Sequence, residues 1–185
     1  MLPTVVIVRH AEKEIGGKAP FGVTIDGTRD SESLTPRGWQ RAGALVTLFV
    51  PRCGHAGCGV APAPAHLFAC RVGSDNADSR RPLETLEPLS ERLGITVDDR
   101  FFRTQVEDVA TAIRACDGVV LVAWEHKMIA GLAATLTGDA GAVPGAWPDD
   151  RFDMSWILEP DDAAGRYAVR QVPQLLLSGD LDRPI

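Results

Sequence analysis

The chain has 185 residues, of which 45% are hydrophobic and 24% charged, and its formal net charge is −6. This length and composition favour one globular domain, which we expect to span residues 1–185. The negative charge argues against nucleic acid or a membrane surface as a partner, since basic surfaces bind both. The apolar runs are shorter than the roughly 20 residues that span a bilayer, and the start lacks a signal-peptide pattern, so we expect a cytoplasmic protein.

The first half of the chain alternates strands with helices. A β-branched run at 5–8 is typical of a strand that is buried on both faces. A helix is predicted over 36–49, with Thr35 as its N-cap. A weak strand at 66–70 and a second helix over 81–93 come next.

The second half continues the alternation. A helix is predicted over 104–116, the clearest strand of the sequence over 119–123, and a further helix over 127–136. Two strands, at 153–158 and 167–172, follow as an expected edge hairpin. Alternating strands and helices predict an α/β fold in which helices cover both faces of a mainly parallel sheet.

Two stretches rich in glycine and proline, 14–33 and 51–65, are predicted to be long surface loops. The second contains Cys53, His55 and Cys58, which could be drawn as a zinc site. However, the paired ligand spacing of structural zinc sites is missing, so we interpret these residues as part of a loop and expect no metal.

Two histidines are predicted to lie at the same edge of the sheet. Arg9 and His10 follow the first strand, and Glu125 and His126 follow the strongest one. Ligands of such sheets bind beyond the carboxyl ends of the strands. Arg81 begins a helix, whose N-terminus favours anions, and arginine can grip two phosphate oxygens at once. Together these residues predict a pocket for a phosphoryl group.

His10 has the chemistry of a phosphoryl acceptor, because histidine can form a covalent intermediate. Its attacking nitrogen must be unprotonated, so the other ring nitrogen needs an acceptor such as a backbone carbonyl. Neighbouring guanidinium groups disfavour the imidazolium form and also bind the phosphate. We therefore expect no metal and no other cofactor.

Four segments carry a resemblance to a known family. Residues 8–13 (VRHAEK) resemble the Arg-His-Gly motif of the histidine phosphatase superfamily, which includes phosphoglycerate mutases and small protein-histidine phosphatases. Residues 34–42 (LTPRGWQRA) are similar to its Leu-Thr-x-x-Gly helix opening, and residues 81–85 (RPLET) to its Arg-x-x-x-Thr element. Residues 119–126 resemble the strand that leads to its second histidine. The motifs follow the order that they have in the family.

The resemblance implies a three-layer α/β/α sandwich of the phosphoglycerate mutase-like type, without a metal cofactor. It implies His10 as the nucleophile, with Arg9, Arg81 and His126 completing the phosphate pocket. The chain departs from the family at Lys13, where a small hydroxyl residue is common.

The proton donor for the leaving oxygen has several candidates. Glu12 and Glu125 adjoin the two histidines, but a neighbour in an extended strand points to the opposite face, so each needs a turn to reach the site. Further candidates lie between the arginine helix and the second histidine: Asp98, Asp99, Glu107 and Asp108. Trp124 is expected either to line the substrate pocket or to be buried.

We therefore expect a phosphoric monoester hydrolase of the histidine acid phosphatase type. It would take phosphate from a small molecule or a phosphoprotein onto His10 and release it to water. A phosphoglycerate mutase, which returns the phosphate to an acceptor, is the first alternative, and the short chain shows no motif for the mutase glutamate. A non-catalytic module that binds anions or a partner on the same fold is the second.

Overall fold

The computed structural model describes residues 2–50, 62–73, 78–161 and 165–185. Its strands are β1 (Thr4–Arg9), β2 (His66–Ala69), β3 (Val97–Asp98), β4 (Val119–Trp124), β5 (Met154–Asp161) and β6 (Arg166–Pro173). Its helices are α1 (Pro36–Phe49), α2 (Arg81–Leu93), α3 (Val106–Arg114) and α4 (His126–Thr137), with a 3₁₀ turn η1 (Ala140–Ala142).

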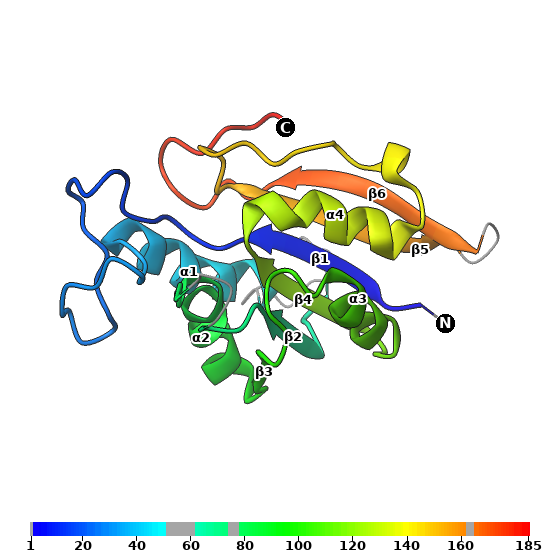
Figure 1. The fold of residues 1–185 in the computed structure, drawn as a ribbon, viewed down its shortest axis with the longest axis horizontal. Coiled ribbons are helices and arrows are strands. Elements are labelled where there is room, and N and C mark those ends of the chain that lie inside the picture. The colour runs from blue at the N-terminus through cyan, green and yellow to red at the C-terminus, as the bar shows by residue number, and fades with distance from the viewer. Residues whose placement is uncertain (1, 51–61, 74–77, 162–164) are drawn as a thin grey trace.

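The strands form one sheet of order β3-β2-β4-β1-β5-β6 (Figure 1). β3, β2, β4 and β1 run parallel, whereas β5 and β6 are antiparallel to their neighbours. The mainly parallel sheet is therefore confirmed. The register pairs Arg9 with Trp124, so β1 and β4 end side by side. His10 and Glu125, the next residues along the two strands, consequently begin at the same edge.

Two helices cover each face of the sheet, as the alternation of side chains along β1 shows. Val5 and Ile7 pack into an apolar cluster with residues of α3 and α4. Val6 and Val8 pack into a second cluster with residues of α1 and α2. The three-layer α/β/α sandwich is therefore confirmed.

Helix boundaries follow the local signals that predicted them. The hydroxyl of Thr35 accepts a hydrogen bond from the N–H of Gly38, and α1 begins at Pro36. α2 ends at Gly94, which adopts the left-handed conformation with φ 68°. α3 is shorter than the predicted helix over 104–116. The two-residue strand β3 was not predicted at all.

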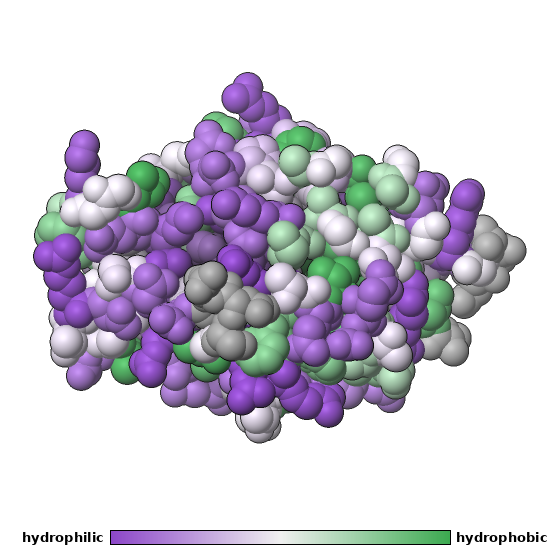
Figure 2. Space-filling view, viewed as in Figure 1, coloured by the Kyte–Doolittle hydropathy of each residue, from purple (hydrophilic) through white to green (hydrophobic). Residues whose placement is uncertain are grey.

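The visible face in Figure 2 is mostly hydrophilic around α1 and the loop that precedes it. It is paler over α4, where white and green side chains gather. Within the described residues, no helix has the length and apolarity that crossing a membrane requires. Cys53, His55 and Cys58 lie outside the described residues. Among those that are described, no group of three or more metal-ligating side chains is placed to hold an ion.

Candidate active site

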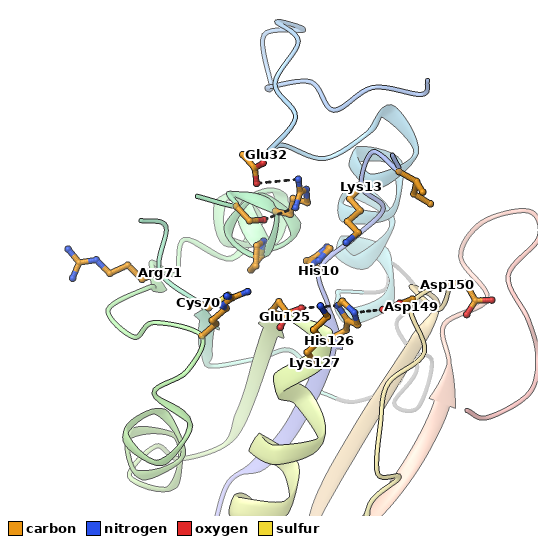
Figure 3. Close-up of a pocket in the computed structure, with 15 residues that line it drawn as sticks. His10, Lys13, Glu32, Cys70, Arg71, Glu125, His126, Lys127, Asp149 and Asp150 are labelled. Atoms are coloured by element: carbon orange, nitrogen blue, oxygen red, sulfur yellow. Dashed lines mark hydrogen bonds and ion pairs between the residues drawn. The ribbon is translucent and has the colours of Figure 1, made fainter. Parts of the chain in front are cut away.

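A pocket of about 530 Å³ lies beyond the carboxyl ends of β1, β2 and β4 (Figure 3). Both His10 and His126 line it. The basic side chains at its wall are Lys13, Arg71, Arg81, Arg103 and Lys127. The acidic ones are Glu32, Glu125, Asp149 and Asp150. The sheet thus brings the two histidines together in a pocket that is rich in charge of both signs.

The imidazole of His10 is held in one tautomer. Its Nδ1 lies 2.8 Å from the carbonyl oxygen of Ala11, which can only accept a hydrogen bond, so Nδ1 carries the proton and Nε2 keeps its lone pair. The side chain is almost fully buried, at 3% exposed. Burial, followed by the positive charges of Arg9, Arg81 and Lys13, holds the pKa of His10 well below its ordinary value of 6.5. His10 is therefore neutral at physiological pH.

Residues of the segments 34–42 and 81–85 hold the backbone that follows His10. The hydroxyl of Thr85 accepts a hydrogen bond of 2.9 Å from the N–H of Ala11. The carbonyl of Glu12 accepts one of 2.9 Å from the N–H of Thr35. A Cβ atom at Gly38 would lie only 2.5 Å from that carbonyl oxygen, so glycine is needed for the close approach of α1. These contacts fix where His10 sits.

Arg9 lies behind the pocket wall and is 1% exposed. Its Nη1 donates to the carbonyls of Pro148, Asp149 and Arg151, at 3.2, 2.6 and 3.2 Å. The guanidinium stacks on the ring of Phe152, with 3.8 Å from Cζ to the ring centre. Burial lowers the pKa of Arg9 to about 10, which still leaves it charged. Its Nε and Nη2 are buried without a hydrogen-bond partner among the described residues.

Arg81, the first residue of α2, lines the pocket but is tethered to the loop before α1. Its Nε donates to the carbonyl of Ser33 at 3.3 Å, and its Nη1 donates to the hydroxyl of Ser79 at 3.1 Å. Its Nη2 donates to the carbonyl of Ser31 and lies 3.4 Å from a carboxylate oxygen of Glu32. Arg81 therefore contributes positive charge, while each of its three nitrogens already has an acceptor.

His126, the first residue of α4, lies between two carboxylates. Its Nε2 is 2.5 Å from Oδ1 of Asp149, and its Nδ1 is 3.1 Å from Oε1 of Glu125. The second contact lacks hydrogen-bond geometry, because Nδ1 has no hydrogen-bond partner among the described residues. Burial and the charge of Arg9 lower the pKa of His126, outweighing the two carboxylates. The hydrogen bond from His126 lowers the pKa of Asp149. A neutral imidazole thus donates to a carboxylate.

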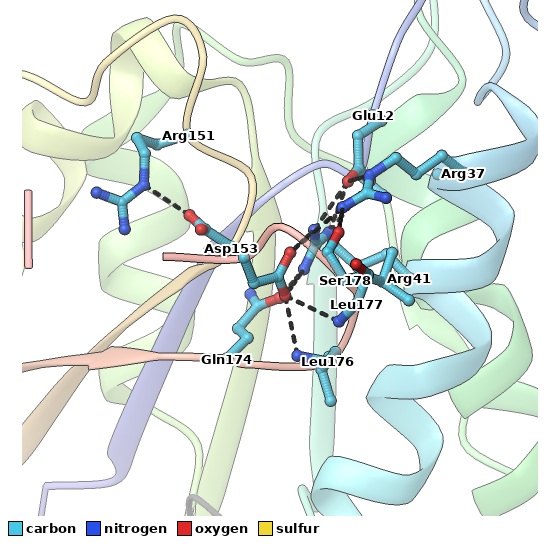
Figure 4. Close-up of polar contacts among 12 residues, drawn as sticks. Glu12, Arg37, Arg41, Arg151, Asp153, Gln174, Leu176, Leu177 and Ser178 are labelled. Carbon is cyan, nitrogen blue, oxygen red and sulfur yellow. Dashed lines mark hydrogen bonds and ion pairs between the residues drawn. The ribbon is translucent and has the colours of Figure 1, made fainter. Parts of the chain in front are cut away.

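The two glutamates beside the histidines point to different places. Glu125 lines the pocket, because β4 ends at Trp124 and the turn into α4 brings Glu125 round to the site. Its Oε2 is buried without a partner in the described chain. Glu12 does not line the pocket. It accepts hydrogen bonds from Arg37 and Arg41 (Figure 4), which hold its side chain away from the pocket. The geometry therefore does not support Glu12 as the proton donor.

None of the candidates between the arginine helix and the second histidine lines the pocket: Asp98, Asp99, Glu107 and Asp108. Trp124 is fully buried, with its indole N–H donated to the carbonyl of Arg103, so of its two predicted positions it takes the buried one. Asp149, which contacts His126, was not predicted, because it comes from an irregular segment between α4 and β5.

Arg41 joins the segment after His10 to the C-terminal part of the chain. Its guanidinium, 2% exposed, donates to Glu12 at 2.8 Å and to Asp180 at 2.7 and 3.0 Å. Asp180 in turn accepts hydrogen bonds from the backbone N–H groups of Leu176 and Leu177, at 2.9 and 3.0 Å. Figure 4 shows these contacts converging between α1 and the end of the sheet. Glu12 therefore belongs to the support of the site.

No protein-family model and no curated protein matches the chain in sequence. Solved structures do match it. YhfR of Bacillus stearothermophilus is 16% identical, over 97% of this chain and 98% of its own, with a TM-score of 0.55. A proposed alpha-ribazole-5'-P phosphatase of Escherichia coli is 14% identical, over 94% and 97%, with a TM-score of 0.53.

A mycobacterial glucosyl-3-phosphoglycerate phosphatase in complex with VO3 is 17% identical, over 92% of this chain and 98% of its own, with a TM-score of 0.50. Identities this low carry information on the fold. The chain has the phosphoglycerate mutase-like fold.

Proposed function

We propose that this protein is a phosphatase that hydrolyses a phosphomonoester through a phosphohistidine intermediate on Nε2 of His10. The observation that carries the proposal is the state of His10 itself. Its imidazole is buried and neutral, the Ala11 carbonyl fixes its tautomer, and it faces a pocket that also contains His126 and Arg81. An unprotonated nitrogen among cationic groups is what attack on a phosphoryl group requires.

In the first step, the lone pair of Nε2 attacks phosphorus and the bond from phosphorus to the leaving oxygen breaks. The equatorial oxygens gather negative charge, so donors placed around them lower the barrier. Arg9 adds positive charge from behind the pocket wall, where its Nε and Nη2 are buried donors without an acceptor in the described chain. His126 would donate its Nε2–H to a phosphate oxygen once the phosphate has replaced Asp149 as the acceptor. Arg81 adds positive charge.

Glu125 is the proposed proton donor. It lines the pocket beside His126, whereas Glu12 is held by Arg37 and Arg41. The protonated carboxyl of Glu125 gives its proton to the leaving oxygen, which departs as an alcohol. In the second step the resulting carboxylate takes a proton from water, the hydroxide forms a bond to phosphorus, and the bond from phosphorus to Nε2 breaks. This releases phosphate and restores the neutral imidazole.

The size of the pocket supports a substrate with an organic group beyond its phosphate. A volume of about 530 Å³ falls within the range of small-molecule sites. The VO3 complex of the mycobacterial phosphatase supports binding of a phosphate-like anion on this fold. A small-molecule phosphomonoester is accordingly the first substrate class to screen, followed by phosphoproteins.

The proposal is tested by p-nitrophenyl phosphate hydrolysis, with rapid quench to trap a phosphoenzyme that is labile in acid. His10→Ala is expected to lose at least about 10³-fold in kcat/KM, because the nucleophile is gone, and to form no phosphoenzyme. His66→Ala is the matched control, since His66 lies outside the pocket and pairs with Asp117. Equal hydrolysis by wild type and His10→Ala, or no hydrolysis across a phosphoester panel, would contradict the proposal.

A further inference from the structure

Lys13 points into the pocket from the segment that carries the nucleophile. Figure 3 shows its side chain running toward His10, and it lines the same pocket as both histidines. The preceding residue, Glu12, points the other way, toward Arg41. Successive side chains of an extended segment alternate in this manner. The backbone at Lys13 pairs with Leu34 in an antiparallel bridge, so the direction of its side chain is set by the fold.

The ammonium of Lys13 makes no hydrogen bond or ion pair within the described part of the chain, whereas Arg81 is tethered through all three nitrogens and Arg9 through Nη1. Arg81 donates to acceptors in the loop before α1 and to Ser79, and Nη1 of Arg9 donates to three carbonyls. Burial, and then the charges of Arg9 and Arg81, lower the pKa of Lys13. The carboxylates of Asp149 and Glu125 offset this effect only in part, so an anion that binds among the three cations is stabilised by them.

We propose that Lys13 is a further substrate-binding residue, whose ammonium contacts the non-bridging oxygens of the phosphoryl group during its transfer to His10. This role rests on the proposed phosphatase function. Lys13 transfers no proton in it. The leaving oxygen lies on the far side of phosphorus from the attacking nitrogen, whereas Lys13 approaches from the segment of His10 itself. Glu125, which comes from the end of β4, remains the proton donor.

The test removes the charge and keeps most of the side chain. Lys13→Met is expected to weaken vanadate binding, measured by calorimetry, about 10- to 100-fold, which is the effect of losing a hydrogen bond to a charged group. It should lower kcat/KM by a similar factor for p-nitrophenyl phosphate and for phenyl phosphate, whose leaving group is poorer. Lys13→Arg should recover most of the loss. Lys18→Met, at an exposed site of the same loop and outside the pocket, should match wild type.

Several outcomes would overturn the role of Lys13. Vanadate affinity and hydrolysis by Lys13→Met equal to wild type would exclude contact with the phosphoryl group. A loss confined to phenyl phosphate would assign Lys13 to protonation of the leaving group instead. If wild type hydrolyses p-nitrophenyl phosphate and His10→Ala does not, the phosphatase function stands. Either of the two results above then refutes only the proposed role of Lys13. If wild type neither hydrolyses a phosphoester nor binds vanadate, the phosphatase function and the role of Lys13 fail together.

Discussion

Replacing Arg41 by methionine should destabilise the protein strongly while preserving the length of the side chain. Arg41 is 2% exposed, and its partners Glu12 and Asp180 are 13% and 3% exposed. Arg41→Met leaves these two carboxylates with Arg37, which is 43% exposed, as their remaining cation. Removing one member of a buried ion pair costs about 3–5 kcal/mol of unfolding free energy. At roughly 2–4 °C per kcal/mol for a chain of this size, the thermal midpoint should fall by about 6–20 °C.

Urea and thermal unfolding at pH 7 measure this change, with Arg37→Met as the matched control. Arg37 contacts the same carboxylate, that of Glu12, but is 43% exposed, so its loss should cost at most about 1 kcal/mol. If the two variants are equally stable, the inference that Arg41 holds a buried network is wrong.

The pH dependence of Arg41→Met checks the cause of its effect. Burial alone would raise the pKa of Asp180, but hydrogen bonds from Arg41 and from the N–H of Leu177 more than offset this and hold it below 3.8. A carboxyl whose pKa is lowered on folding contributes stability that is present above its unfolded value and lost as the pH falls through the folded one. The difference between wild type and Arg41→Met should therefore shrink below pH 3.8. A difference that is constant down to pH 2 would contradict this origin.

Three further predictions concern the site. Glu125→Gln should lower kcat for phenyl phosphate about 10²- to 10⁴-fold, because the proton donor is lost. Glu12→Gln should lower mainly the stability of the fold. Equal losses of kcat in the two variants would count against Glu125 as the proton donor. Because the pKa of His10 lies well below 6.5, kcat/KM for p-nitrophenyl phosphate should not fall as the pH decreases through 6.5, and an acidic limb centred there would be inconsistent with a neutral nucleophile. Thr85→Val leaves the buried N–H of Ala11 without its acceptor and should cost about 1–3 kcal/mol in urea unfolding, with Thr85→Ser as the control; equal stability of the two variants would remove that hydrogen bond from the explanation.

The arrangement of the fold could be predicted because its signals are local. The apolar runs of β1 and β4, the Thr35 cap and the left-handed Gly94 each determine an element through nearby residues. β3 could not be found, because two residues are too few to show a period and their pairing depends on the exposed edge of β2. α3 was overestimated by two residues at each end, since the composition near a helix terminus does not reveal where the hydrogen bonding stops.

Site residues could be predicted only where they lie directly at the end of a strand or at the start of a helix. His10, His126 and Arg81 were placed in this way, and all three line the pocket. The choice between Glu12 and Glu125 was open, because it depends on which backbone turns and which partners are near. The position of the Glu12 side chain is determined by its contact with Arg41, which lies 29 residues away in the chain.

The carboxylate of Asp149 gives the pocket an internal counter-ion. Any phosphate that reaches Nε2 of His126 has to replace it, and Asp149, whose side chain is 89% exposed, can turn into solvent while its backbone stays attached to Arg9. Binding of a phosphate is then an exchange of one anion for another, and not the addition of an anion to a pocket that contains only cations. Exchanging the Asp149 carboxylate for a phosphate changes the net charge of the pocket by less than adding a phosphate would. The affinity for a dianion should therefore vary less with ionic strength than the number of surrounding cations suggests.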